Sequence, residues 1–72
     1  MIEIKIDTDY IKLDQFLKLA DLAQTGGHGK IIIKEGRVKV NNQVTLARGK
    51  KLYDGDIVEV EDSGRFLVKR KV

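Results

Sequence analysis

The sequence predicts an α+β fold, in which two helices pack on one face of a small, mostly antiparallel twisted sheet. Three observations favour this class. Apolar residues alternate with polar residues in several short segments, apolar residues elsewhere recur at spacings of three and four, and glycine or asparagine turns separate these segments. A chain of 72 residues is the size of one small domain, so we expect a single domain spanning 1–72.

A strand and a helix are predicted first. Isoleucines alternate with charged residues over 2–6, which indicates a half-buried strand, and a turn follows at 7–9. One face of the helix is then defined by Leu13, Phe16, Leu17, Ala20 and Ala23. Leu19 and Leu22 widen this apolar stripe, so we expect the helix to contact more than one neighbour.

A second helix is expected to begin at Thr25, whose hydroxyl can accept a hydrogen bond from the first turn. Its body is 30–35, and Gly36 ends it because glycine readily adopts the left-handed conformation. The segment Gly26–Gly29 contains three glycines, each costing about 1 kcal/mol relative to alanine in a helix interior. Two explanations stay open: a phosphate bound closely at the helix start, with Lys30 adding charge, or a tight helix–helix turn that needs small residues.

The second half of the chain is predicted to form the rest of the sheet. Valines alternate with basic residues over 37–40, and Asn41–Asn42 is a two-residue turn able to reach positive φ. Val44 is expected to start the return strand, followed by an irregular basic loop over 45–52. Further strands are expected at 57–60 and 66–69, with turns at 53–56 and 61–64.

Positive charge is concentrated in the middle of the chain. The segment 28–51 holds seven basic residues and one acidic residue, whereas the whole chain holds 14 basic and 11 acidic residues. The seven are Lys30, Lys34, Arg37, Lys39, Arg48, Lys50 and Lys51. We expect the strand and loop members to form one continuous patch that attracts a polyanion. Basic side chains favour phosphates and the shape of helical RNA, and the scarcity of exposed aromatic candidates beyond Tyr10 and Tyr53 disfavours unpaired strands.

Catalytic and metal-binding groups are scarce. The chain has no cysteine, one histidine (His28) and one serine (Ser63), so a nucleophile, a base and an orienting group are not readily assembled. Asp54 and Asp56 supply too few ligands for calcium, and we expect them to act in a turn. His28 is expected to be a solvated polar residue, although contact with a phosphate or a base is the alternative. We therefore predict no enzymatic activity, no metal and no cofactor.

The N-terminal segment and the overall hydropathy indicate a soluble protein. No apolar run approaches the roughly 18 residues that a membrane span requires. Residues 1–6 alternate apolar and charged side chains, unlike the continuous apolar core of a signal peptide. We expect a cytoplasmic monomer with no membrane association.

Four segments, in this order and spacing, resemble one family. They are Leu13-Asp14-x-Phe16-Leu17-Lys18, then Thr25, then Ile33-Lys34-Glu35-Gly36-Arg37-Val38-x-Val40-Asn41, and finally Gly55-Asp56-Ile57-Val58-x-Val60. Together they resemble the alpha-L RNA-binding motif, the domain of ribosomal small-subunit protein S-four, with a motif core over about 12–60. The chain looks most like the short stand-alone bacterial members of the YaaA type, through the segments 15–20, 25–27 and 48–53.

The resemblance implies two helices against a small twisted sheet and an RNA surface around the start of the second helix. Carried over by position, that surface includes Lys12, Lys18, Thr25, Lys30, Lys34, Arg37, Lys39 and Asn41. The narrower likeness adds Arg48, Lys50 and Lys51. Two positions depart from the family pattern: Gly26 stands where many members have arginine, which removes one fork-shaped phosphate contact, and Asn42 replaces the usual turn glycine.

The sequence thus predicts a non-catalytic protein that docks on structured RNA, with ribosomal RNA or an assembling ribosomal subunit as the expected partner. Electrostatic capture by the basic patch would precede shape fitting at the start of the second helix. The alternative is a protein-interaction module for an acidic partner, which the loss of arginine at Gly26 favours.

Overall fold

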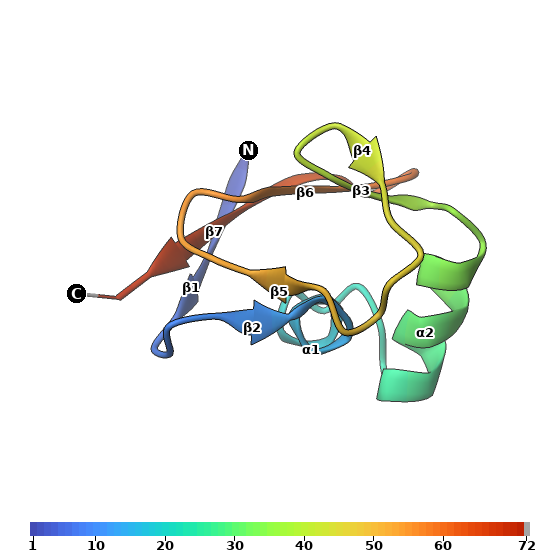
Figure 1. Ribbon diagram of the computed structural model, residues 1–72, viewed down its shortest axis with the longest axis horizontal. Coiled ribbons are helices and arrows are strands. Elements are labelled where there is room, and N and C mark those ends of the chain that lie inside the picture. Colours follow the sequence, from blue (N-terminus) through green and yellow to red (C-terminus); the bar gives the residue numbers. More distant parts are fainter. Residues whose placement is uncertain (72) are drawn as a thin grey trace.

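The computed structural model describes residues 1–71 and confirms the predicted α+β class, with both helices on one side of a mostly antiparallel sheet (Figure 1). The elements, in chain order, are β1 (Ile2–Ile6), β2 (Ile11–Lys12), α1 (Leu13–Leu19), α2 (Gly26–Lys34), β3 (Val38–Val40), β4 (Gln43–Val44), β5 (Lys51–Leu52), β6 (Ile57–Val60) and β7 (Gly64–Arg70).

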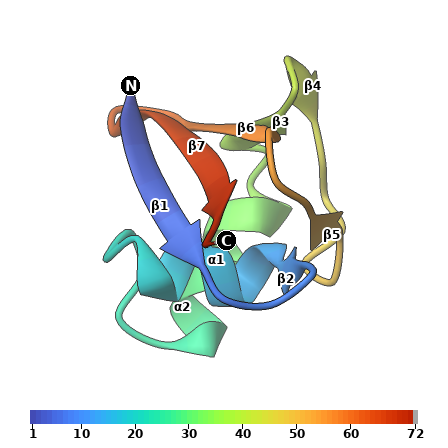
Figure 2. The same ribbon diagram turned by 90° about the vertical axis from the view of Figure 1, so that its left-hand side faces the viewer.

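The main sheet has five strands in the order β1-β7-β6-β3-β4. The pairs β7–β6, β6–β3 and β3–β4 are antiparallel, whereas β1 pairs in parallel with β7, from Ile2 opposite Phe66 to Ile6 opposite Arg70. Figure 2 shows β1 and β7 side by side above the helices. The C-terminal ends of β1 and β7 therefore lie together at one end of the molecule, opposite α2 (Figure 1).

The structure contains a second sheet that we did not predict from the sequence, because an irregular loop was expected over 45–52. β2 and β5 form an antiparallel pair, with Ile11 opposite Leu52 and Lys12 opposite Lys51. Two residues per strand are too few to show a period-two pattern, so no local signal marks this pair. Leu52 is fully buried and Ile11 packs against the core, so the two lysines point away from it.

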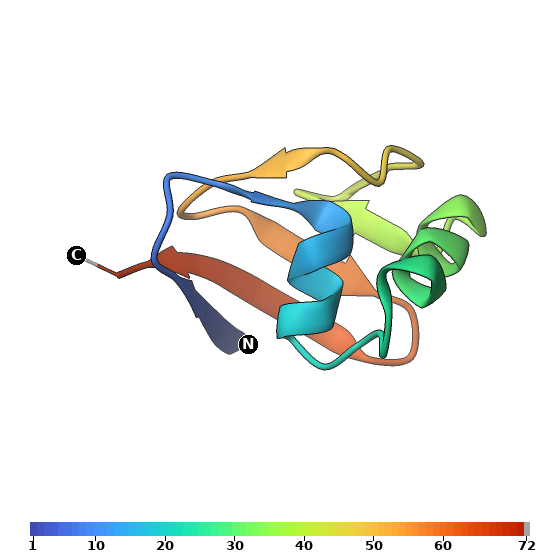
Figure 3. The same cartoon turned by 90° about the horizontal axis from the view of Figure 1, so that it is seen from below.

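Figure 3 shows α1 crossing the face of the main sheet, and the core side chains come from the helices and strands of these two packed layers. Its buried side chains are Ile6, Leu13, Phe16, Leu17, Ala23, Ile32, Ile33, Val38, Val40, Leu52, Val58, Val60, Phe66 and Val68. Valines 38 and 40 alternate with an exposed lysine, which confirms the predicted strand pattern. The core is almost entirely aliphatic, and Phe16 and Phe66 are its two aromatic members.

The first helix is shorter than its apolar stripe suggests. It ends at Leu19, and Asp21 adopts the left-handed conformation (φ 64°). The N–H groups of Leu22 and Ala23 then both donate to the Leu17 carbonyl oxygen, at 2.8 and 3.2 Å. Ala23 is buried although it lies beyond the end of the helix, whereas Leu19 is 53% exposed and does not belong to the buried face. The helix contacts both α2 and β2, so the expectation of more than one neighbour is confirmed.

The predicted turns are confirmed, with small shifts in strand ends. Gly36 follows α2 with φ 74°, and Asn41 and Asn42 both have positive φ, at 51° and 70°. Val40 lies opposite Gln43, so the hairpin loop has two residues and the return strand starts one residue earlier than expected. The last strand is also longer than the predicted 66–69.

Candidate nucleic-acid interface

The start of α2 is fixed by Thr25, as the sequence predicted. Its Oγ1 accepts a hydrogen bond from the His28 N–H at 3.1 Å, which is an N-cap. His28 is exposed, and its Nδ1 accepts the N–H of Gln24 at 3.4 Å. These contacts lie within the start of the helix, so they explain the presence of Thr25 and His28 there without a bound ligand.

The glycines at this helix start differ in their surroundings. Gly29 is buried where α2 meets α1, and a Cβ there would lie 3.5 Å from the Asp14 carbonyl oxygen and 3.7 Å from Leu17. Gly27 is exposed, and a Cβ there would meet only the Thr25 hydroxyl, at 3.8 Å. Helix packing therefore limits the size of the residue at position 29 but leaves room for a methyl group, and it places no limit on Gly27.

The basic loop before β5 is held against the start of α1 by backbone hydrogen bonds. The N–H of Asp14 donates to the Arg48 carbonyl oxygen at 3.0 Å, and the N–H of Leu13 donates to the Lys50 carbonyl oxygen at 2.9 Å. Free N–H groups at a helix start need such acceptors. The backbone of Arg48 and Lys50 is thereby fixed, while both side chains remain exposed.

This loop faces α2 across a hollow of about 330 Å³, which we call the α2–loop hollow. Its lining residues are Lys30, Lys34, Leu46, Ala47, Arg48 and Gly49. Lys30 and Lys34 are four residues apart, so they lie on one face of α2. Three cations from two separate segments converge here, although the wall itself is mostly apolar. Sequence reasoning missed Leu46; its 63% exposure is the unusual feature, and only the structure reveals it.

The outward side of the β2–β5 pair extends this positive surface. Lys12 and Lys51 are direct cross-strand partners, and like charges in that position destabilise a sheet. The Lys51 ammonium lies 4.8 Å from the ring centroid of Tyr10, a cation–π contact, and the Tyr10 and Tyr53 rings are 5.9 Å apart. An anion bound beside the two lysines would relieve their repulsion.

Arg37 and Lys39 lie in a different environment from the α2–loop hollow. They line a separate hollow of about 120 Å³ that also contains Glu59 and Glu61. Arg37 pairs with Glu35 at 3.5 Å, and Lys39 lies directly opposite Glu59. Glu59 itself pairs with Arg65 at 3.5 Å. Carboxylates thus lie near Arg37 and Lys39 and lower the local positive potential, and the two hollows share no lining residue.

Two further predicted positions also lie apart from the hollow. Both polar atoms of the Asn41 side chain are engaged within the fold: Nδ2 donates to Asp56 Oδ1 at 3.1 Å, and Oδ1 accepts the Ile57 N–H at 3.0 Å. Lys18 is exposed in the last turn of α1, where a cation interacts favourably with the helix C-terminus.

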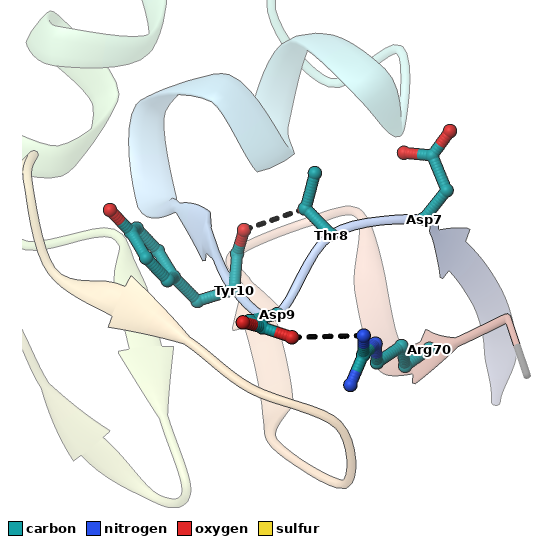
Figure 4. A pocket seen from close by; sticks show the side chains of 5 residues that line it. All are labelled: Asp7, Thr8, Asp9, Tyr10 and Arg70. Atoms are coloured by element: carbon teal, nitrogen blue, oxygen red, sulfur yellow. Dashed lines mark hydrogen bonds and ion pairs between the residues drawn. The ribbon is translucent and has the colours of Figure 1, made fainter.

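A larger hollow, of about 550 Å³, lies at the other end of the molecule and is lined by Asp7, Thr8, Asp9, Tyr10 and Arg70 (Figure 4). Arg70 pairs with Asp9 at 2.9 Å, and Thr8 donates to the Tyr10 carbonyl oxygen at 2.7 Å. The one cation among these lining residues is already paired with Asp9, and Asp7 adds a second negative charge, so this wide hollow offers less for an anionic ligand than the smaller α2–loop hollow.

The carboxylates of Asp54 and Asp56 fasten turns, in line with the role expected from the sequence. Asp54 Oδ1 accepts the Arg70 N–H at 2.7 Å, and Asp56 Oδ2 accepts the Tyr53 N–H at 2.8 Å. Within residues 1–71, no group of three or more histidine, cysteine or acidic side chains is arranged to hold a metal ion.

The family assignment follows from comparison with known proteins. The model of the S4 domain matches residues 4–69, so the chain belongs to the S4 domain family, and the resemblance inferred from its motifs is confirmed. A similar protein is the probable ribosome maturation protein RlbA of Bacillus subtilis (strain 168). It is 52% identical over 65 residues, which cover 90% of this chain and 92% of that protein. Among the described residues, no helix has the length and apolar character needed to cross a membrane.

Proposed function

We propose that this protein binds structured RNA without catalysis, and that its target is ribosomal RNA or a ribosome assembly intermediate. Membership of the S4 domain family and the high identity to a probable ribosome maturation protein support this function. We further propose that it acts in the bacterial cytoplasm as a monomer without a cofactor.

The observation that carries the proposal is the convergence of Lys30, Lys34 and Arg48 on one hollow from separate segments. Phosphates would be captured first by these cations, because long-range attraction acts before close contact. The anchored loop would then fit the shape of the RNA. Our proposed contact surface is centred on six residues: Lys12, Lys30, Lys34, Arg48, Lys50 and Lys51. The other predicted residues are secondary candidates, because each has another role within the fold or lies away from the hollow. These are Lys18, Thr25, Arg37, Lys39 and Asn41.

A charge-reversal experiment tests this surface. Arg48→Glu combined with Lys50→Glu should weaken the binding of a ribosomal RNA hairpin strongly in a gel-shift titration, while circular dichroism and thermal unfolding stay unchanged. The folded state should persist because the fold uses the backbone carbonyls of these residues and leaves their side chains exposed.

The matched control is Lys5→Glu with Lys69→Glu, which changes net charge equally at the β1–β7 end of the molecule (Figure 1). This control should weaken binding only slightly. Equal losses in both double variants would mean that net charge, rather than the α2–loop surface, governs the interaction. Full retention of RNA by the Arg48 and Lys50 double variant would refute the proposed surface.

A second candidate function is a protein-interaction module that grips an acidic partner. Gly26 favours it, because the family resemblance implies a phosphate-contacting arginine at this position and the chain has glycine there. A pull-down with the purified protein, performed with and without ribonuclease, separates the two functions. Partners that survive nuclease treatment support the protein-interaction module.

A further inference from the structure

The α2–loop hollow combines an apolar wall with a cationic rim, and this combination restricts what can occupy it. Leu46 and Ala47 contribute apolar surface, and Leu46 is 63% exposed. Lysine and arginine side chains commonly lay their carbon stems along apolar surface and keep their charges at the edge. A well-matched occupant therefore has a flat apolar body and negative charge beside it. A phosphate alone would leave the apolar wall uncovered.

The size of the hollow suits a ring-shaped group. A cavity of about 150 Å³ holds benzene, so about 330 Å³ has room for a nucleobase. The hollow is also preformed, because backbone hydrogen bonds fix the loop at Arg48 and Lys50, and the Lys50 N–H donates to the Ala47 carbonyl oxygen at 3.1 Å. A fixed site loses little conformational entropy when a ligand binds.

The arrangement of the cations matches the backbone on either side of one nucleotide. Lys30 and Lys34 are about 6 Å apart along the axis of α2, since each residue rises about 1.5 Å. Arg48 approaches from the opposite wall, and its planar guanidinium can stack on a base or bind a phosphate. Bases inside a regular RNA helix are stacked and cannot enter such a hollow. The base must come from a bulge or a loop.

We propose that the α2–loop hollow binds a single unstacked base of an otherwise helical RNA, with the flanking phosphates held by Lys30, Lys34 and Arg48. This inference rests on the proposed RNA-binding function and specifies the RNA feature recognised. The side chains lining the hollow are aliphatic or cationic. They include no neutral hydrogen-bonding group, so the site accepts the four bases with little preference.

The test compares two RNA hairpins that differ only by one bulged nucleotide, using fluorescence anisotropy at a single salt concentration. The bulged hairpin should bind about tenfold more tightly, which is the scale of one well-packed base contact. Replacing the bulged nucleotide by an abasic one, which keeps the phosphate, should remove this advantage. A 2-aminopurine at the bulge should change its fluorescence when the protein binds.

Two variants test the hollow without removing charge. A side chain at Gly49 would meet no atom within 4 Å of its Cβ, so Gly49→Leu should fill the hollow at little cost to folding. Leu46→Ala removes part of the wall, and Val44→Ala is its control, because Val44 is similarly exposed (54%) and does not line the hollow. Gly49→Leu and Leu46→Ala should abolish the advantage of the bulge and leave binding of the paired hairpin unchanged. Val44→Ala should retain the advantage.

The outcomes distinguish this inference from the proposed function. Equal, salt-dependent binding of both hairpins by the unaltered protein would overturn the base-binding site and leave RNA binding intact. Failure to bind either hairpin would overturn both. An acidic peptide containing leucine provides the remaining comparison: if Gly49→Leu blocks the peptide but not the bulged RNA, the hollow is a protein-binding site and the inference is wrong.

Discussion

Asn41 and Asp56 join two turns of the fold, because the Asn41 Nδ2 donates a hydrogen bond to Asp56 Oδ1 at 3.1 Å. Asn41 also accepts the N–H of Ile57 and has positive φ, which asparagine tolerates better than most residues. Asp56 in turn accepts the N–H of Tyr53. The β3–β4 hairpin is thereby tied to the loop that leads into β6. A position that the family likeness assigned to RNA thus has a structural role.

Replacing Asn41 should therefore affect stability more than RNA affinity. Asn41→Ala should lower the free energy of unfolding by about 2 kcal/mol, from two lost hydrogen bonds and a strained left-handed residue. Asn41→Gly should cost less, since glycine removes the strain but not the lost bonds. Urea unfolding measures both values. Unchanged stability together with weakened RNA binding would instead identify Asn41 as an RNA contact.

Gly29 is expected to tolerate a methyl group. A Cβ there would lie 3.5 to 3.7 Å from its neighbours, which is ordinary van der Waals contact, and alanine favours a helix more than glycine. Gly29→Ala should stabilise the protein by about 0.5 to 1 kcal/mol. Thermal unfolding is the measurement, with Gly29→Val as the oversized comparison. A marked loss of stability in the alanine variant would show that α1 and α2 require closer approach.

Asn42 should be improved by the glycine that is usual at this turn. Its φ of 70° suits glycine better, and asparagine followed by glycine is a favoured pair in two-residue hairpins. Asn42→Gly should raise the free energy of unfolding by about 0.5 kcal/mol. Denaturant titration checks this value, and a decrease would indicate that the Asn42 side chain contributes a contact of its own.

The salt dependence of RNA binding should report the number of phosphates held. We expect about four to six contacts, each adding roughly 0.7 to 0.9 to the slope of log affinity against log salt concentration. Lys30→Gln with Lys34→Gln should reduce that slope by about 1.4 to 1.8, because two contacts are lost. The comparison is Lys39→Gln. Lys39 lies opposite Glu59, so this variant should leave the slope nearly unchanged. A larger effect at Lys39 would reverse our assignment of the two surfaces.

Local sequence patterns predicted most of the fold, because the predicted elements are determined by residues close together in the sequence. The Thr25 cap, the Gly36 stop and the Asn41–Asn42 turn depend on side-chain and backbone preferences within a few residues. The parallel pairing of the first and last strands and the pairing of β2 with β5 depend on tertiary contact between distant segments. No local signal encodes them.

The candidate site was predicted only in part for the same reason. Sequence alone detected the concentration of positive charge, but it could not detect that Glu59 lies opposite Lys39. It also could not detect that Leu46 lines a hollow with Lys30 and Arg48, since Leu46 lies 12 or more positions along the chain from the lysines of α2. The number of basic residues in a segment predicts the class of partner. The neighbours of each basic side chain in the folded protein decide whether its charge is available to bind that partner.

The central claim is that RNA binds across the α2–loop surface, and a nuclear magnetic resonance titration with a bulged RNA hairpin tests it most directly. Amide shifts should change most at Lys12, Lys30, Lys34 and the segment 46–51, and little at Lys39, Glu59 and Arg65. Shifts concentrated on the β1–β7 end, or centred on Arg37 and Lys39, would contradict the account.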